Sequence, residues 1–154
     1  MLNSSTDTKI KAHGNIASLN KGTDDAYKTN YLTADDHGYL FLFLECASLI
    51  QAPELPATTL MNNCYDSMFY NCTSLVNAPE LPATTLINNC YDSMFKGCTS
   101  LNYIKCLATN RSAEKCTFDW VKGVAPTGNF YKNPSATWET GTSGIPTGWT
   151  SHNA

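Results

Sequence analysis

Apolar residues recur at a fixed interval through the middle of the chain. Residues 48–73 are repeated at 74–99, with 21 of the 26 positions identical. Four series of identical residues recur at this spacing of 26: Leu49, Leu75 and Leu101; Phe43, Phe69 and Phe95; Cys46, Cys72 and Cys98; and Cys64, Cys90 and Cys116. A lone unit of this length cannot bury its apolar side, so neighbouring units must stack. The pattern therefore predicts an α/β repeat fold, a solenoid of 26-residue coils.

Within each coil, the segment 63–72 has the apolar spacing of a short helix. Its apolar residues stand at positions i, i+1, i+4, i+5 and i+8, which lie on one face of a two-turn helix. Asn63 is a suitable N-cap, and Asp66 falls at the third helical position, where a carboxylate favours the positive helix end. A short helix is therefore predicted on one side of each coil.

The predicted end of this helix is marked by a substitution between the two copies. Asn71 in one copy is replaced by Gly97 in the other. Both residue types tolerate the left-handed conformation that ends many helices. The equivalent earlier position is Glu45, which does not fit this rule, so the first helix is expected to end differently.

After each helix the chain is predicted to be extended. Leu75 opens the stretch LVNAPELP, and such stretches from stacked coils would form a short parallel sheet on the side opposite the helices. Pro79 and Pro82 cannot donate hydrogen bonds to a neighbouring strand. The paired run is therefore expected to cover about three residues.

The repeated motif resembles a known family. The pattern MF-x-x-C-T-S-L-x-x-A-P-x-L-P-A-T-T-L, at 68–86 and partly at 94–107, is similar to the BspA-like leucine-rich repeats of bacterial surface proteins, and the segments 14–22 and 144–151 resemble their flanks. The resemblance implies a leucine-rich-repeat solenoid, secreted and displayed on the bacterial cell surface, with a role in adhesion or protein binding. No secretory signal precedes the repeats, so this interpretation makes the chain a mature form or a monomeric domain of a longer protein.

A single domain is expected over residues 1–154. Its parts are an N-terminal cap with a degraded first coil (1–46), regular repeats (47–104) and a C-terminal cap (105–154). All three tryptophans, Trp120, Trp138 and Trp149, follow the regular repeats. They are interpreted as cover for the last coil in preference to a sugar-binding site.

Composition and charge exclude several functions. Charged residues make up 15% of the chain, the net charge is −3, and the basic residues are scattered, which argues against nucleic-acid binding. The apolar run 39–44 is too short to span a membrane. No catalytic or phosphate-binding motif occurs, and His13, His37 and His152 share no motif with an acid or nucleophile. We therefore expect no enzyme activity and no cofactor.

The seven cysteines are an odd number, which argues against a fully paired disulfide framework. No two of them have the close spacing of a zinc site. We expect most of them to be buried and reduced, with bridges between coils as the alternative. Cys106 replaces Glu54 and Glu80 at the same coil position and is expected to be the most exposed thiol.

A binding strip is predicted on the open face of the sheet. If Leu49 and Ala52 point inward, along with their counterparts in later coils, strand alternation places Gln51, Asn77 and Tyr103 outward in one row. Glu54 and Glu80 follow close beside the row. The two carboxylates alone are too few ligands for a calcium site to be favoured.

Two functions fit this strip. The first is a non-enzymatic module that binds a protein or glycan ligand outside the cell, and the alternative is a structural spacer or stalk of a larger surface protein. A binding face should vary between coils, and the row reads Gln, Asn and Tyr. This variation favours binding.

Overall fold

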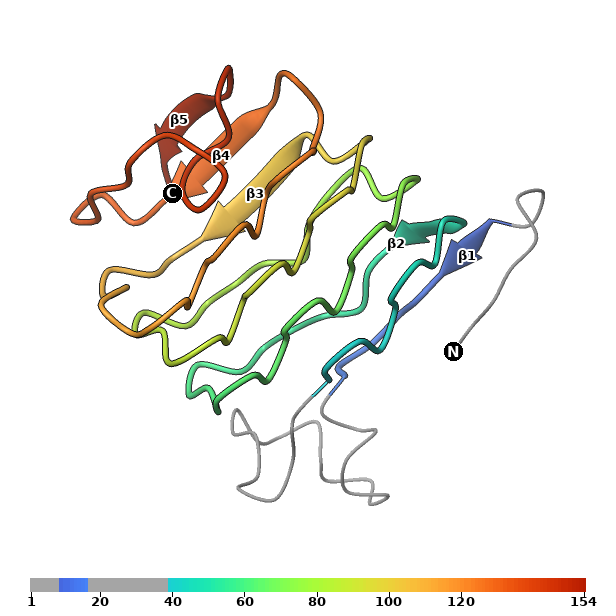
Figure 1. Cartoon of the computed structure of the whole chain (residues 1–154), viewed down its shortest axis with the longest axis horizontal. Coiled ribbons are helices and arrows are strands. Elements are labelled where there is room, and N and C mark those ends of the chain that lie inside the picture. The colour runs from blue at the N-terminus through green and yellow to red at the C-terminus, as the bar shows by residue number, and fades with distance from the viewer. Residues whose placement is uncertain (1–8, 17–38) are drawn as a thin grey trace.

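The computed structural model describes residues 9–16 and 39–154, and within them the chain forms five short strands. These are β1 (Ile10–Lys11), β2 (Leu49–Gln51), β3 (Tyr103–Cys106), β4 (Asn129–Lys132) and β5 (Thr150–Asn153). β1 pairs with β2, and a second sheet has the order β3-β4-β5, with every pair parallel (Figure 1). Parallel pairing of strands that follow one another in sequence requires the chain to return to the same side after each strand.

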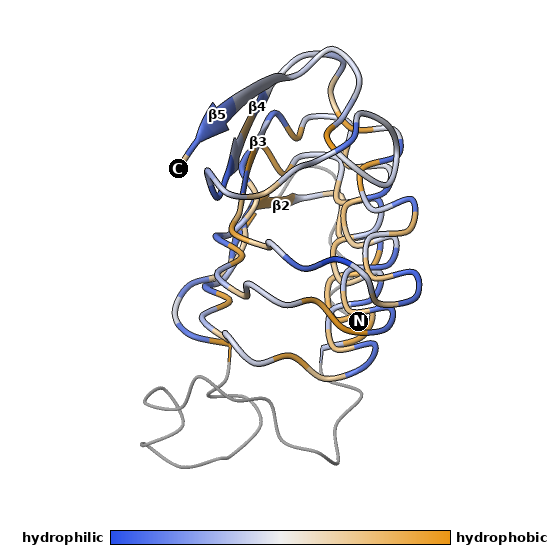
Figure 2. Ribbon diagram, turned by 90° about the vertical axis from the view of Figure 1, so that its left-hand side faces the viewer, coloured by the Kyte–Doolittle hydropathy of each residue, from blue (hydrophilic) through white to orange (hydrophobic). Residues whose placement is uncertain are grey.

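The predicted helix-bearing leucine-rich-repeat solenoid is wrong. The described residues contain no helix, and their strands form two small parallel sheets. The segments expected to be helical run instead as successive turns. We call these segments the turn wall (39–46, 61–72, 87–98 and 113–124), and we call the extended segments facing them the sheet wall (10–16, 49–60, 75–86 and 101–110). Figure 2 shows the two walls on opposite sides of the molecule.

Hydrogen bonding explains why the turn wall is not helical. The Cys64 amide donates to the carbonyl oxygen of Met61, three residues back, at 3.2 Å, whereas the Tyr65 amide donates across to Cys90 at 3.1 Å. This alternation continues along the segment, so every second amide bonds to the next stretch of the turn wall. An α-helix would use all of these amides internally. The turns also repeat every four residues, close to the helical 3.6, so the apolar spacing could not separate the two structures.

Left-handed backbone conformations recur within each turn segment. Asn63, Ser67 and Asn71 have φ angles of 59°, 51° and 57°. The prediction for Asn71 and Gly97 is confirmed, since Gly97 has a φ of 77°, although neither residue ends a helix. Glu45 also has a left-handed φ of 57°, so the different ending expected there is wrong.

Side chains at equivalent positions of successive repeats stack through the core. The rings of Phe43 and Phe69 are 5.5 Å apart, and those of Phe69 and Phe95 are 5.6 Å apart, all nearly parallel. A second stack of Tyr39, Tyr65 and Tyr91 runs beside them and meets Trp120. Trp120, Trp138 and Trp149 are buried, which agrees with their interpretation as cover for the end of the core.

Removing the hydroxyl groups of Tyr39 and Tyr65 should affect stability differently. The Tyr39 hydroxyl donates a hydrogen bond to the Ile16 carbonyl oxygen at 3.0 Å, whereas the buried Tyr65 hydroxyl has no hydrogen-bond partner among the described residues. We expect Tyr39→Phe to lower the free energy of unfolding by about 1 kcal/mol. Tyr65→Phe should leave it unchanged or raise it, because a buried unpaired hydroxyl is costly. Urea unfolding measures both, and equal losses would contradict this difference.

Candidate functional site

The sheet wall is open between segments 49–60 and 75–86. The first segment bonds to the preceding part of the wall, for example from the Glu54 amide to the Gly14 carbonyl oxygen at 2.9 Å. The second bonds to the following part, from the Leu81 amide to the Lys105 carbonyl oxygen at 3.0 Å. No backbone hydrogen bond joins these two described segments to each other. The turn wall behind them stays bonded, so the opening is confined to the sheet side.

Proline explains the position of this opening. Both segments contain the sequence A-P-E-L-P, so neither has an amide hydrogen at its two proline positions. In the next segment the equivalents of Pro79 and Pro82 are Lys105 and Ala108, which restore the two donors, and Lys105 lies within β3. β2 ends at Gln51 after three residues, as the prolines predicted.

A groove occupies the opening, with a cavity volume of about 420 Å³. This volume lies within the range of ligand-binding pockets. Four of its eight lining residues are prolines, and two are the glutamates expected at the binding strip; the lining is Ala52, Pro53, Glu54, Leu55, Pro56, Pro79, Glu80 and Pro82. The groove is therefore largely apolar with two carboxylates.

The groove is also lined by residues whose main-chain amides are not hydrogen bonded to other described residues. Glu54 uses both its amide and its carbonyl toward the preceding segment, and Leu81 uses both toward the following segment. Leu55 and Glu80 come next to these bonded residues, and both of them line the groove. Neither of their amides donates a hydrogen bond to another described residue. The groove therefore offers main-chain donors and acceptors on both walls.

The two carboxylates of the groove differ in their surroundings. Glu80 forms an ion pair with Lys105 at 3.0 Å between Oε1 and Nζ, and both side chains are partly exposed. Among the residues that the structure describes, Glu54 has no ion-pair partner. Within 9–16 and 39–154, no three histidine, cysteine or acidic side chains are grouped to hold a metal ion.

The predicted row is divided by the groove. Asn77 and Tyr103 are paired across the sheet wall, and Tyr103 is paired in turn with Asn129. Gln51 lies on the other side of the opening, where its amide nitrogen is 3.1 Å from Nδ1 of His13. The structure therefore brings Asn77 and Tyr103 together, places Glu54 and Glu80 in the groove and leaves Gln51 apart from Asn77.

Aromatic residues extend this surface beyond the predicted row. The rings of Tyr103 and Tyr131 are 5.2 Å apart, and Tyr131 stacks on His152 at 4.7 Å. His152 is hydrogen bonded through Nε2 to the Asn129 side chain at 2.8 Å. These residues were not predicted to contribute, because the repeat fades after residue 107. The signal was present, since Tyr131 follows Lys105 at the interval of the repeat.

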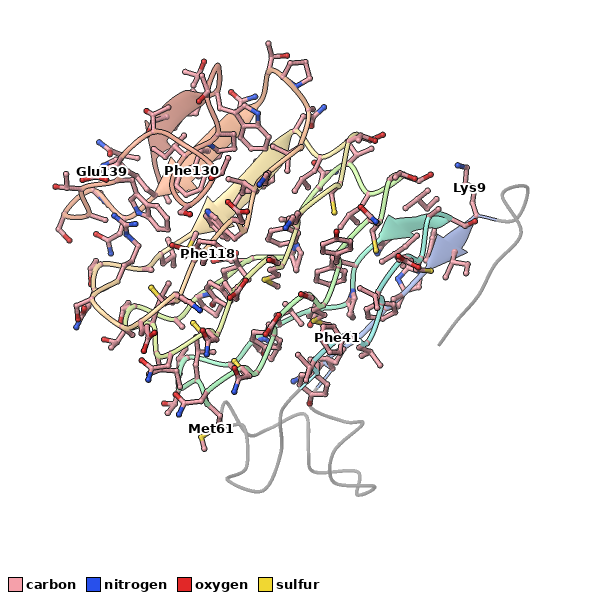
Figure 3. All side chains as sticks on the ribbon, viewed as in Figure 1. Lys9, Phe41, Met61, Phe118, Phe130 and Glu139 are labelled. Carbon is pink, nitrogen blue, oxygen red and sulfur yellow. The ribbon has the colours of Figure 1, made fainter. Side chains whose placement is uncertain are left out.

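The opposite, turn-wall side offers a different kind of surface. Phe41 and Phe118 are exposed there by 46% and 49% (Figure 3). They lie at opposite ends of the turn wall, in its first and last segments. Neither residue lines the groove or the smaller cavities near residues 121–126 and 139–147. We therefore place the candidate site on the sheet wall.

The thiols take no part in this surface. All seven cysteines are buried and free, which confirms the prediction that most are buried and reduced. The expectation that Cys106 is the most exposed is wrong, because it is fully buried. Its side chain turns inward from β3, and burial raises its pKa to about 12. Burial likewise raises the pKa of Cys64 and of Cys98 to about 12.

No protein family, characterised protein or solved structure matches the chain. The resemblance to BspA-like proteins and the location that it implies therefore stay predictions. The leucine-rich-repeat fold and the adhesion role that the resemblance implies are not supported, since the described residues contain no helix and form two small parallel sheets. In the described part of the chain, no helix has the length and apolar character needed to cross a membrane.

Proposed function

We propose that this protein is a non-enzymatic binding module that holds part of a protein or glycan against its sheet wall. The observation that carries the proposal is the groove between segments 49–60 and 75–86, where the backbone pairing of the wall is interrupted. Pockets that bind ligands combine apolar lining with a few polar groups that fix orientation. The prolines supply the first property, and the carboxylates and open main-chain groups supply the second.

The surface beside the groove has the composition of a recognition surface. Tyr103, Tyr131 and His152 present stacked rings, and Asn77 and Asn129 flank them with amide groups. Aromatic side chains provide large contact areas together with a polar atom at one end, which suits both protein and sugar partners. The groove and this aromatic row are therefore two parts of the candidate surface on the sheet wall.

The absence of catalysis is part of the proposal. Nucleophilic cysteines need a lowered pKa and access to solvent, whereas the cysteines of this chain are buried and burial raises the pKa of most of them. Location outside a bacterial cell is proposed on the resemblance of the repeats alone.

Binding should depend on the sheet wall. We expect the purified protein to bind probes on an array of peptides and glycans, and the triple variant Asn77→Ala, Tyr103→Ala, Tyr131→Ala to bind at least about tenfold more weakly, since a recognition surface loses most affinity when its central contacts are truncated. The matched control is Asn62→Ala with Phe118→Ala, two exposed residues of the turn wall. No binding by the wild type, or equal loss in the control, would contradict the proposal.

A further inference from the structure

We propose that the groove takes an extended peptide segment that carries a lysine or arginine side chain. This inference rests on the proposed function, because it specifies the ligand of the same site. Three properties of the groove lead to it: open main-chain groups on both walls, an excess of hydrogen-bond acceptors, and an uncompensated carboxylate.

The open main-chain groups favour an extended backbone. Leu55 and Glu80 stand on opposite walls, and neither amide is used by another described residue. A peptide lying along the groove could pair with one wall or both as an added strand, which is a common way to bind extended peptides. A glycan could use single hydrogen bonds here but could not reproduce the regular spacing of peptide groups.

The prolines shift the balance of hydrogen-bonding groups. Pro53, Pro56, Pro79 and Pro82 contribute carbonyl oxygens but no amide hydrogens. Glu54 and Glu80 add four carboxylate oxygens when ionised. The lining therefore has more acceptors than donors, and a ligand rich in N–H groups complements it.

The charges at the groove indicate which side chain the bound peptide should carry. Lys105 pairs with Glu80 at the rim of the groove, which leaves the Glu54 carboxylate without an ionic partner among the described residues. The Lys105 pair is partly exposed, and such pairs are weak enough to rearrange. A guanidinium or ammonium group from a peptide can therefore contact Glu54 directly and share Glu80 with Lys105. An acidic ligand would be repelled.

The test uses three blocked fluorescent peptides that differ at one position. The central residue, flanked by valines, is arginine, glutamine or glutamate. At low ionic strength, fluorescence anisotropy should show the arginine peptide binding at least about tenfold more tightly than the glutamine peptide, because a charge-assisted hydrogen bond is about twice as strong as a neutral one. The glutamate peptide should bind most weakly. Methylation of the valine amide nitrogens should remove most of the binding, because it blocks pairing as a strand.

Variants of the groove assign the preference to its carboxylates. In Glu54→Gln with Glu80→Gln, the arginine peptide should lose its advantage over the glutamine peptide. The matched control is Glu114→Gln, an exposed glutamate of the turn wall, which should keep it. Equal affinity for the three peptides, or an unchanged preference in the double variant, would overturn the inference. Retained binding to other probes of the array would in that case leave the proposed function standing, and a wild type that binds nothing would remove both.

Discussion

The free energy of unfolding should fall steeply once the pH rises above about 9, the ordinary pKa of a cysteine thiol. Burial raises the pKa of Cys64, Cys98 and Cys106 from 9.0 to about 12. The pKa values of Cys72 and Cys90 are also raised, again chiefly by burial. In the unfolded chain these thiols lose their protons near pH 9, whereas in the folded protein they keep them. High pH therefore favours the unfolded state.

The sign and size of this effect follow from proton linkage. A group whose pKa is raised by folding contributes its full stability below the unfolded pKa and loses it as the pH approaches the folded pKa. Each such thiol costs on the order of 1 kcal/mol per pH unit once the pH has passed its unfolded pKa. Several thiols acting together would cost several kcal/mol per unit, which is comparable to the whole stability of a typical domain. Unfolding is thus expected within about one to two units above pH 9.

Guanidinium unfolding at pH 7, 8.5, 9.5 and 10.5 measures this loss, with a reductant present throughout. The decline between pH 7 and 8.5 should be much smaller than the decline between pH 8.5 and 9.5. The variant Cys106→Ala should show a shallower decline, because one of the buried thiols is gone. A free energy of unfolding that stays constant from pH 7 to 10.5 would show that the thiols are not buried as described.

The sequence predicted which residues stack but not the backbone that stacks them. The interval of the repeat correctly placed Phe43, Phe69 and Phe95 on top of one another, because identical side chains at a fixed interval can share one core position. It could not distinguish a helix from turns that repeat every four residues, since both put the same side chains inward. Residues that favour the left-handed conformation distinguish turns from a helix better than the apolar spacing does. Asn63 and Ser67, as well as Asn71, adopt this conformation, and a helix tolerates it only at its end.

The candidate site was likewise predicted only in part. The prolines correctly indicated a short paired run, and Glu54 and Glu80 do lie in one groove. The groove itself was not predicted, because it depends on two proline-bearing segments facing each other, which a reading of one segment at a time does not reveal. Tyr131 and His152 were missed for a different reason. Their strands, β4 and β5, continue the parallel sheet that begins at β3, but their sequences no longer match the repeated motif.

The sheet wall is open between segments 49–60 and 75–86, and the two sides of this opening provide an internal comparison. Glu54-Leu55 and Glu80-Leu81 occur in the same local sequence, P-E-L-P, so their amides should have nearly equal intrinsic rates of hydrogen exchange. In the structure the Glu54 and Leu81 amides donate hydrogen bonds to neighbouring segments, whereas the Leu55 and Glu80 amides, in residues that line the groove, donate none to another described residue. Any difference in rate therefore reports hydrogen bonding.

Amide hydrogen exchange followed residue by residue with NMR is the most direct test. Hydrogen-bonded amides of a folded wall exchange only when the structure opens, whereas amides open to solvent need no such event. We expect Leu55 to exchange at least about a hundredfold faster than Leu81, and Glu80 at least about a hundredfold faster than Glu54. This order alternates along the chain, so fraying of one segment cannot produce it. Equal rates within each pair would mean that the wall is closed, and the groove with its proposed ligand would then be wrong.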